Sequence, residues 1–454
     1  MQKKNNRATL RSRVFQASTW TVGGHFTGQV LRLASNLIMT RLLVPEMFGV
    51  MAVVTVIMNG LSSLSQTGID QCIVNSERGA ERTFLNTAWV VQAGRGMLIG
   101  LAVVLVALAL YFAGASHWLP AGSVYADPLL PAVLAVSSLS VVIAGFRSTY
   151  ATALYRQVHV GKNTLTELAG TVVGLLAMIV WAVYDRSIWA LAVGGIAAEI
   201  VRTWLSHAWV AEGKNRFEWD AAAFAEILHF GKWIFVATIF FYLSSQSDRL
   251  LLGGLISAGE LGVYAIAFFL AAALQQIVGA ISTKVIFPAL REVHNADTAR
   301  LGAVYYRVRQ YIDLAAYATA GLLFSSGDLL VRLLYDDRYT EAGWMLKILS
   351  LSLLGVGFRT VDQCLLALGH VRWISILTAT QGVALVIMIP LAFHLAGLEG
   401  AIWAIALSFI PNVLLSWWFM QRLGMLHMVL ELWLLAIFPL AYLLGIGLRQ
   451  LLGL

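Results

Sequence analysis

The sequence is divided into apolar stretches that are each about as long as a membrane-spanning helix, with short polar breaks between them. A spanning α-helix needs about 20 predominantly apolar residues. Only 12% of the 454 residues are charged, whereas about a quarter are charged in soluble domains. The pattern predicts an all-α polytopic membrane protein and excludes an enzyme that is held by a single anchor.

Apolar runs bounded by charged residues, glycine or proline predict thirteen helices. They are expected near residues 17–43, 47–68, 84–112, 129–153, 165–184, 188–210, 227–250, 261–287, 311–334, 342–367, 373–394, 398–421 and 429–450. The helices predict four parts: a six-helix lobe at 1–211, a cytoplasmic linker at 212–226, a second lobe at 227–424 and an additional C-terminal helix at 425–454. Pro439 interrupts this last helix.

Most of the 31 lysines and arginines fall in the N-terminal segment and in every second connection, including Arg307 and Arg309. Because cytoplasmic segments retain basic residues, we expect a cytoplasmic N-terminus. The formal net charge of +7 then reflects orientation, and no nucleic acid is expected as a partner. Cys72 and Cys364 lie far apart in apolar contexts without metal-ligand spacing, so we expect no disulfide, metal or cofactor.

The chain matches itself at a shift of 212 to 214 residues in three places. Gly145–Ser148 recurs as Gly357–Thr360, and Ile188–Ala190 recurs as Ile402–Ala404. In the first hairpin, Leu42, Gly49, Val50 and Ala52 correspond to Leu255, Gly262, Val263 and Ala265. The matches predict two copies of a six-helix unit in the same orientation, arranged as parallel repeats around a central cleft.

Polar side chains at helical spacing form stripes on the first two helices of each lobe. In the first lobe the stripes comprise His25, Gln29, Arg32 and Asn36, followed by Asn59, Ser63, Gln66 and Asp70. In the second lobe they comprise Thr238, Tyr242, Ser245 and Arg249, followed by Gln276 and Thr283. A polar group in hydrocarbon is costly unless it faces protein or water, so the repeated stripes favour a substrate cleft. A helix–helix hydrogen bond explains a single such residue equally well.

Five arginines fall within predicted spans: Arg32, Arg95, Arg147, Arg202 and Arg359. Glu199 lies one turn from Arg202, and Asp362 lies one turn from Arg359, which predicts two ion pairs. Arg32 and Arg95 have no acid at helical spacing, which favours an anion such as phosphate as their partner.

The acidic residues in or near the predicted spans have two possible roles. Glu167, Glu199, Asp248 and Asp362 are either coupling sites for a proton or cation, or structural partners of the arginines. Arg147 and Arg359 occupy equivalent places in the two copies, and Arg147 has Tyr150 where Arg359 has Asp362. The two arginines either form a gate that receives substrate or extend towards cytoplasmic lipid phosphates.

Several segments resemble the polysaccharide transport family. They are the turn Arg41–Gly49, the helix openings Ser187–Leu191 and Leu261–Tyr264, and the step Gly369–Arg372. The resemblance covers about residues 14 to 421 and is closest to the Wzx-like O-antigen and exopolysaccharide flippases of the multidrug/oligosaccharidyl-lipid/polysaccharide exporter superfamily. Members commonly have 12 or 14 helices, so the predicted thirteen depart from the pattern.

The resemblance implies two six-helix bundles in a V and a polyprenyl-pyrophosphate oligosaccharide as substrate. It also implies a bacterial inner membrane, with membrane lipids and the glycan polymerase and chain-length machinery as partners. The polar residues predicted in the cleft agree with such a substrate, because a polar cleft shields its pyrophosphate and sugars while its lipid tail stays in the bilayer. Alternating access then requires no reaction chemistry.

Two alternatives stay open from the sequence. A cation-coupled drug exporter would need acidic cleft residues, which the basic excess within the spans disfavours. An oligosaccharide polymerase or ligase would need placed catalytic groups, and the longest outer loop, Ala113–Pro128, offers only His117 and Asp127.

Overall fold

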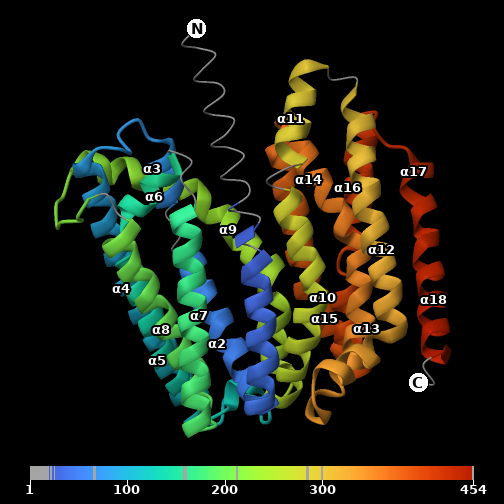
Figure 1. Ribbon diagram of the computed structural model, residues 1–454, viewed down its shortest axis with the longest axis horizontal. Helices are drawn as coiled ribbons and strands as arrows, with labels where there is room; N and C mark the ends of the chain where they lie inside the picture. The colour runs from blue at the N-terminus through green and yellow to red at the C-terminus, as the bar shows by residue number, and fades with distance from the viewer. Residues whose placement is uncertain are drawn as a thin grey trace. The chain divides into compact units, whose positions relative to one another are not determined.

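The computed structural model describes residues 20, 23–24, 26–64, 68–156, 161–210, 213–282, 286–297 and 300–451, and all regular elements in these ranges are helical (Figure 1). This confirms the predicted all-α class. The chain separates into two compact units, residues 1–239 and residues 240–454, which are called the first and second unit here. Each is described by itself.

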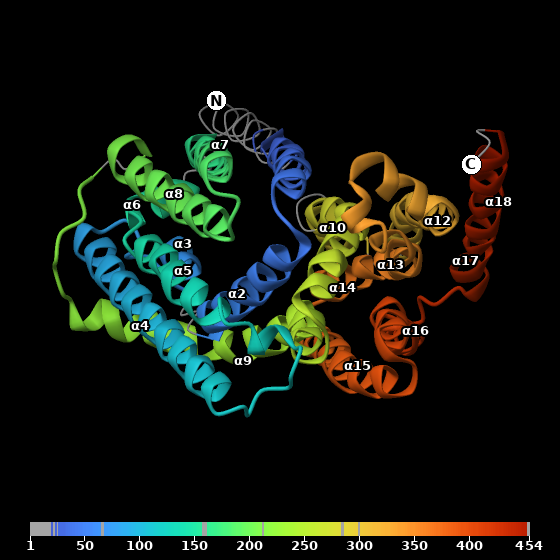
Figure 2. The same ribbon diagram turned by 90° about the horizontal axis from the view of Figure 1, so that it is seen from below.

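In the first unit, residues 26–42 are helical, and eight further helices follow. They are α2 (Pro45–Leu64), α3 (Ile69–Asn75), α4 (Arg82–Ala115), α5 (Leu130–Gly145), α6 (Thr149–Arg156), α7 (Gly161–Tyr184), α8 (Trp189–Leu205) and the start of α9 (Ala221–Leu255). Helix α5 packs against α2, α4 and α8, and α8 packs against α7. Figure 2 gives a second view of these helices, turned by 90° about the horizontal axis.

The second unit begins within α9 and continues to the end of the described chain. Its helices are α10 (Ala258–Ile281), α11 (Phe287–Ala296), α12 (Leu301–Leu334), α13 (Ala342–Leu349), α14 (Arg359–Ala367), α15 (Val371–Leu407), α16 (Ile410–Arg422), α17 (Met428–Leu432) and α18 (Ile437–Leu451). A 3₁₀ segment, Ser350–Phe358, joins α13 to α14. Helix α12 packs against α13, the 3₁₀ segment and α18.

The predicted helices correspond to these elements, with differences at the breaks. The gap predicted between 394 and 398 is confirmed, because Ala396 and Gly397 interrupt α15 with non-helical backbone angles. The single helix predicted at 129–153 is wrong, because α5 ends at Gly145 and α6 begins at Thr149. The helix predicted at 342–367 likewise changes to a 3₁₀ segment in its middle.

The order of elements confirms the internal duplication. Helices α4 and α12 each have 34 residues, and α2 and α10 begin at Pro45 and Ala258, a shift of 213. Helix α5 ends at Gly145, and the 3₁₀ segment ends at Phe358. The repeated Gly-Phe-Arg motif therefore lies at a helix break in both copies.

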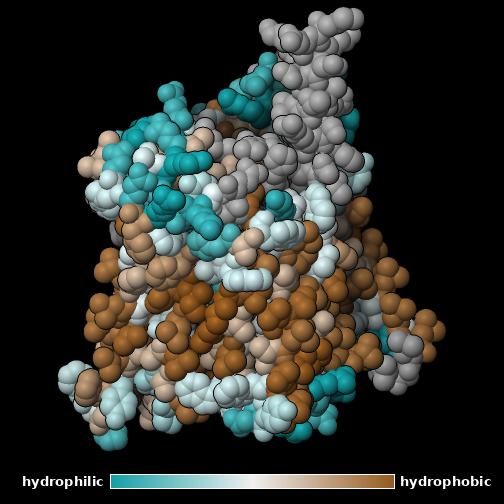
Figure 3. Space-filling view, turned by 60° about the vertical axis from the view of Figure 1, so that its left-hand side comes forward, coloured by the Kyte–Doolittle hydropathy of each residue, from teal (hydrophilic) through white to brown (hydrophobic). Residues whose placement is uncertain are grey.

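Seven stretches of the described chain are long and apolar enough to cross a membrane. They are Pro45–Ser63, Arg82–Ala115, Gly161–Tyr184, Leu301–Leu334, Ala342–Ala367, Val371–Arg422 and Met428–Leu451. The last stretch is the additional C-terminal helix of the sequence prediction, and Pro439 lies in the first turn of α18. On the face drawn in Figure 3, hydrophobic residues form a band between two hydrophilic ends, as expected for a surface that contacts lipid.

The polar stretch between α8 and α9 is not helical at residues 213–220 and lies against the start of α4. Asn86 Nδ2 donates to Glu218 Oε2 at 2.7 Å, and Arg78 Nη2 donates to Asp220 Oδ2 at 2.6 Å. The hydrogen bond from Arg78 holds the pKa of Asp220 below its ordinary value. The chain divides between Ile239 and Phe240, inside α9, whereas the sequence places its linker at 212–226. The four-part division stays a prediction.

Candidate functional site

The break between α5 and α6 is held by side chains of α4. Trp89 Nε1 donates to the Phe146 carbonyl at 3.1 Å, and Gln92 Nε2 donates to the carbonyls of Gly145 and Arg147 at 3.1 and 3.0 Å. A break within a membrane-spanning helix leaves carbonyls without helical partners, and these must be satisfied by protein or water. The two side chains therefore keep the break in place and position Arg147.

Arg147 belongs to a closed group of two arginines and two glutamates, which we call the charge square. Arg147 Nη1 lies 3.0 Å from Glu167 Oε1, and its Nη2 lies 2.5 Å from Glu199 Oε2. Arg202 Nε lies 3.0 Å from Glu167 Oε2, and its Nη1 lies 2.6 Å from Glu199 Oε1. Arg202 also donates to Thr171 Oγ1. The square joins α7, α8 and the break after α5.

The charge square changes the sequence interpretation of Arg147. The pair expected between Glu199 and Arg202 is present. Arg147 has Tyr150 at the place where a local acid would lie, and its acidic partners Glu167 and Glu199 come from other helices. Helical spacing reports only partners on the same helix, so it could not show this pairing.

The charge square forms one wall of a polar pocket of about 560 Å³ in the first unit, the N-terminal pocket. Arg95 and Asp70 lie in its lining as well. Thr152 Oγ1 donates to Asp70 Oδ1 at 3.0 Å, whereas Arg95 has neither an ion pair nor a hydrogen bond within the described residues. Three arginines and three acids line the pocket, so its formal charges balance despite the basic excess within the predicted spans.

The second unit contains a pocket of about 510 Å³, the C-terminal pocket. Many of its lining residues correspond to those of the N-terminal pocket at the shifts read from the sequence. At the shift of 213, the pairs are Met58 with Ala271, Asn59 with Ala272 and Ser62 with Gln275. At the shift of 212, they are Ser140 with Ser352, Ala144 with Val356 and Arg147 with Arg359. At the shift of 214, Arg202 corresponds to Ser416. The duplication thus extends to the two pockets.

Charged groups are arranged differently in the C-terminal pocket. Arg359 and Asp362 both line it, but the ion pair expected between them is not formed, and that expectation is wrong. Asp362 lies one turn along α14, which is near enough for spacing to suggest a pair, yet the two side chains do not meet. Asn412 Nδ2 donates to Gln381 Oε1 at 3.3 Å in the same pocket.

Two further charged residues lie at the edge of this region in α9. Asp248 is 4% exposed and accepts a 2.5 Å hydrogen bond from the Tyr264 hydroxyl. Arg249 stacks its guanidinium 4.6 Å from the centre of the Phe268 ring. Asp248 lines the pocket, whereas Tyr242 and Arg249 do not.

The structure brings most of the predicted site residues together, but in two pockets. Asn59, Asp70, Arg95, Arg147, Glu199 and Arg202 line the N-terminal pocket. Ser245, Asp248, Gln276, Arg359 and Asp362 line the C-terminal pocket. Gln29, Arg32 and Asn36 line neither pocket, and His25, Gln66 and Thr283 lie outside the described residues.

A buried charge network in the second unit was missed by the sequence interpretation. Arg309 in α12 is 2% exposed, and its Nη1 donates to Glu431 Oε1 at 2.5 Å and to the Tyr305 hydroxyl at 2.9 Å. Its Nε donates to Asp313 Oδ2 at 3.1 Å. Trp417 Nε1 donates to Glu431 Oε2 at 2.8 Å. The network ties α17 to α12 and α16.

The start predicted for this helix at 311 is wrong, because α12 begins at Leu301, and Arg309 is a buried helix residue and not part of an exposed connection. The sequence does indicate one ion pair of this network, because Arg309 and Asp313 are four residues apart and share a helix face. Nothing in the sequence points to Glu431, which lies more than 100 residues further along the chain.

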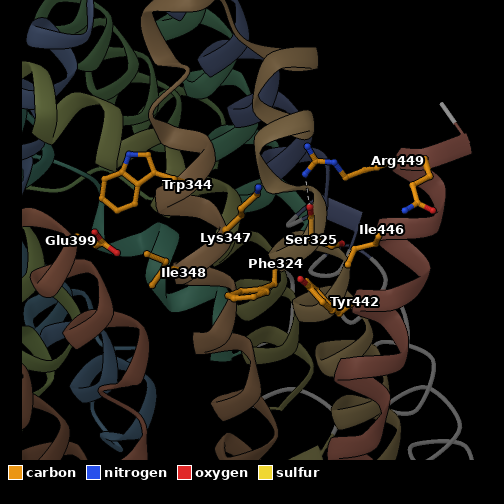
Figure 4. Close-up of a pocket in the computed structure, with 10 residues that line it drawn as sticks. Phe324, Ser325, Trp344, Lys347, Ile348, Glu399, Tyr442, Ile446 and Arg449 are labelled. Atoms are coloured by element: carbon orange, nitrogen blue, oxygen red, sulfur yellow. Dashed lines mark hydrogen bonds between the residues drawn. The ribbon is translucent and has the colours of Figure 1, made fainter. Parts of the chain in front are cut away.

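A third pocket, of about 840 Å³, lies beside α18 and is drawn in Figure 4. Asp328 in α12 accepts from Lys347 Nζ at 2.8 Å and from both Nη atoms of Arg449 at 2.9 and 3.0 Å. Arg449 also donates to the Ser325 carbonyl. These contacts attach the end of α18, and also α13, to α12.

Comparison with known proteins gives a sequence and a structural likeness. A sequence model of the family described as "Polysaccharide biosynthesis protein" matches residues 38–344. The lipopolysaccharide biosynthesis protein WzxC of Escherichia coli (strain K12) is 23% identical over 453 residues, which cover 97% of this chain and 89% of that protein.

Among solved structures, the lipid II flippase MurJ in an inward closed conformation has a TM-score of 0.68 at 15% identity, covering 94% of this chain and 98% of that one. An inward-facing multidrug resistance MATE family transporter of the MOP superfamily has a TM-score of 0.67 at 12% identity, covering 87% and 94%. The fold is therefore that of these two proteins, which are described as a flippase and a transporter.

Proposed function

Because the chain belongs to the polysaccharide biosynthesis protein family, we propose that it is a flippase for a lipid-linked oligosaccharide. The substrate is a polyprenyl-pyrophosphate oligosaccharide, destined for O-antigen or exopolysaccharide. The protein moves it from the cytoplasmic to the outer leaflet of a bacterial inner membrane, with its own N-terminus in the cytoplasm. Glycan polymerase and chain-length proteins are the partners that follow from this role.

The observation that carries the proposal is the N-terminal pocket with Arg95 in its wall. An arginine among membrane-spanning helices normally pairs with an acid, yet the described residues offer Arg95 neither an ion pair nor a hydrogen bond. A pyrophosphate would supply the anion, because the planar guanidinium donates two parallel hydrogen bonds to phosphate oxygens.

The charge square lies in the same pocket and supplies further donors. Glu167 is its most accessible acid, with a side chain that is 53% exposed against 17% for Glu199. A pyrophosphate competes with Glu167 for Arg147 Nη1 and Arg202 Nε. Glu199 then keeps both arginines in position, and the exchange is reversible, as a transport cycle requires. Alternating access by the two repeats completes the cycle.

The test measures translocation in proteoliposomes that contain a polyprenyl-pyrophosphate oligosaccharide with a fluorescent sugar, read as the fraction of label that an external quencher reaches. We expect Arg95→Gln to slow translocation about tenfold or more, because charge-assisted hydrogen bonds to phosphate are lost. Arg82→Gln is the matched control, because Arg82 begins the same helix, is exposed and lies outside the pocket. Equal rates for wild type and Arg95→Gln would contradict the pyrophosphate role.

A cation-coupled drug exporter is the competing function, and the charge square disfavours it. Such an exporter needs carboxylates that are open to a cation, whereas Glu167 and Glu199 each contact two arginines. Proton- or sodium-driven movement of a cationic dye in the same proteoliposomes, without movement of the lipid-linked oligosaccharide, would favour the exporter.

A further inference from the structure

We infer that the C-terminal pocket binds the sugar residues of the substrate, as a neutral glycan subsite separate from the site of the pyrophosphate. The inference rests on the proposed function and adds to it a ligand class for the second unit.

The lining of the C-terminal pocket has the side chains that bind sugars. Gln275, Gln363, Gln381 and Asn412 contribute amides, which donate and accept hydrogen bonds as sugar hydroxyls do. Phe241, Phe268, Phe358 and Phe409 contribute aromatic rings, which pack against the apolar C–H faces of sugar rings. A volume of about 510 Å³ is within the range of small-molecule sites and holds a short oligosaccharide.

Comparison of the two copies shows that this lining has three charged residues, against six in the other pocket. At the shift of 214, Arg202 corresponds to Ser416, and Glu199 corresponds to Val413, which is adjacent to Asn412. The ion-paired arginine and glutamate of the first copy thus have a hydroxyl and an apolar side chain as their counterparts on α16, with an amide beside them. The two copies share a framework but present different chemistry.

Two buried polar atoms in this lining lack a hydrogen-bond partner within the described residues. Within the described residues, Asn412 Oδ1 and Ser282 Oγ are buried without a hydrogen bond, although both residues line the pocket. Buried polar groups in proteins are nearly always hydrogen-bonded, and an unmet acceptor is costly. A sugar hydroxyl donates to Asn412 Oδ1 and both donates to and accepts from Ser282 Oγ.

The formal charge of the C-terminal pocket disfavours a phosphate. Arg359 is its single cation among the lining residues, and Asp248 and Asp362 are its two acids, which leaves a net charge of −1. The separation of Arg359 from Asp362 leaves one charged donor and one charged acceptor for hydroxyls. Hydrogen bonds from hydroxyls to charged groups are stronger than those between neutral groups.

The experiment compares two fluorescent probes in proteoliposomes: a polyprenyl pyrophosphate that carries a single sugar and one that carries the full repeat-unit oligosaccharide of the host. Asn412→Ala is expected to slow the oligosaccharide probe about tenfold and the single-sugar probe less than about twofold, because hydrogen bonds to the outer sugars are lost. Gln421→Ala, an exposed amide on the same helix outside the pocket, is the control and should change neither rate.

A second measurement keeps the inference testable if Asn412→Ala is poorly folded. The free oligosaccharide, released from its lipid by mild acid, should raise the thermal stability of purified wild-type protein and of Arg95→Gln, and Ser282→Ala should weaken this effect. Inorganic pyrophosphate should stabilise wild type but not Arg95→Gln.

Equal slowing of both probes by Asn412→Ala, or no binding of the free oligosaccharide, would overturn the glycan subsite. Failure of wild type to move either probe would overturn the proposed function instead. The two failures are therefore distinguishable.

Discussion

Among single residues, Arg309 carries the largest expected energetic effect, because its guanidinium is almost fully buried and depends on oxygens from three residues. Its Cζ atom also lies 4.0 Å from the centre of the Phe358 ring, and Phe358 lines the C-terminal pocket. A buried charge is tolerated only while its partners remain. The network therefore holds one wall of the C-terminal pocket as well as the C-terminal segment.

Replacing Glu431 by glutamine should destabilise the protein by about 3 to 5 kcal/mol, because it leaves the buried Arg309 with a single acid. Thermal unfolding of the purified protein in detergent measures the loss. Glu292→Gln, an exposed acid in α11, is the control and should unfold as wild type does. A Glu431→Gln protein with an unchanged unfolding temperature would show that the pair contributes little.

At the scale of elements, the packing of α4 against the end of α5 depends on two glycines. A Cβ added to Gly96 would lie 2.8 Å from the Gly145 Cα, and one added to Gly145 would lie 2.9 Å from the Gly96 Cα. Both contacts involve backbone, which cannot turn aside as a side chain does. This close approach brings the break after Gly145 within reach of Trp89 and Gln92.

Gly96→Ala should therefore destabilise the first unit by about 1 to 3 kcal/mol and slow translocation, because it displaces the break that positions Arg147. Gly94→Ala is a matched control two residues away, where an added Cβ meets nothing within 4 Å. It should stabilise α4 by about 0.5 to 1 kcal/mol, because alanine favours helix over glycine. Similar unfolding temperatures for the two variants would contradict the packing argument.

The strap of residues 213–220 should be sensitive to acid. The pKa of Asp220 is lowered in the folded protein by its hydrogen bond from Arg78, so the contact stabilises the strap above the ordinary carboxyl pKa. The stabilisation is lost as the pH falls below that value and through the lowered pKa of the folded state. We expect proteolysis of the strap to accelerate as the pH is lowered from 5 towards 3.

The effect is measured as the rate at which an acid-stable protease such as pepsin cleaves the chain within residues 213–220. The variant Asp220→Asn should be cleaved faster at pH 5 and should show a weaker dependence on pH, because it cannot titrate. The same pH dependence in both proteins would assign the effect to other groups.

At the scale of the whole molecule, the C-terminal segment is an integral part of the second unit. Glu431 and Arg449 form ion pairs with α12, and α18 packs along that helix. A chain that ends at Gly424 should lose its folded second unit, because Arg309 and Asp328 lose partners and the face of α12 is uncovered. Size-exclusion chromatography of the truncated protein in detergent should show aggregation.

A truncation after Leu451 is the control for this prediction, because it keeps α17 and α18. A truncated chain ending at Gly424 that remains monodisperse and thermally stable would show that the segment is dispensable.

The sequence by itself determined the features that depend on local patterns. Apolar length and polar breaks located most of the helices, and short repeated motifs revealed the duplication, because both signals lie within contiguous residues. The same motifs located the arginines of both pockets, Arg147 and Arg359, at corresponding positions. The break after Gly145 and the 3₁₀ segment Ser350–Phe358 were missed, because contacts from other helices stabilise them.

The tertiary structure alone decided which charges pair. Arg147 meets Glu167 and Glu199, which lie 20 and 52 residues further along the chain, and Arg309 meets Glu431, 122 residues away. Spacing along one helix predicted a pair for Arg359 that does not form. The physical reason is that ion pairing depends on distances of a few ångströms in space, and packing between helices sets those distances independently of separation along the chain.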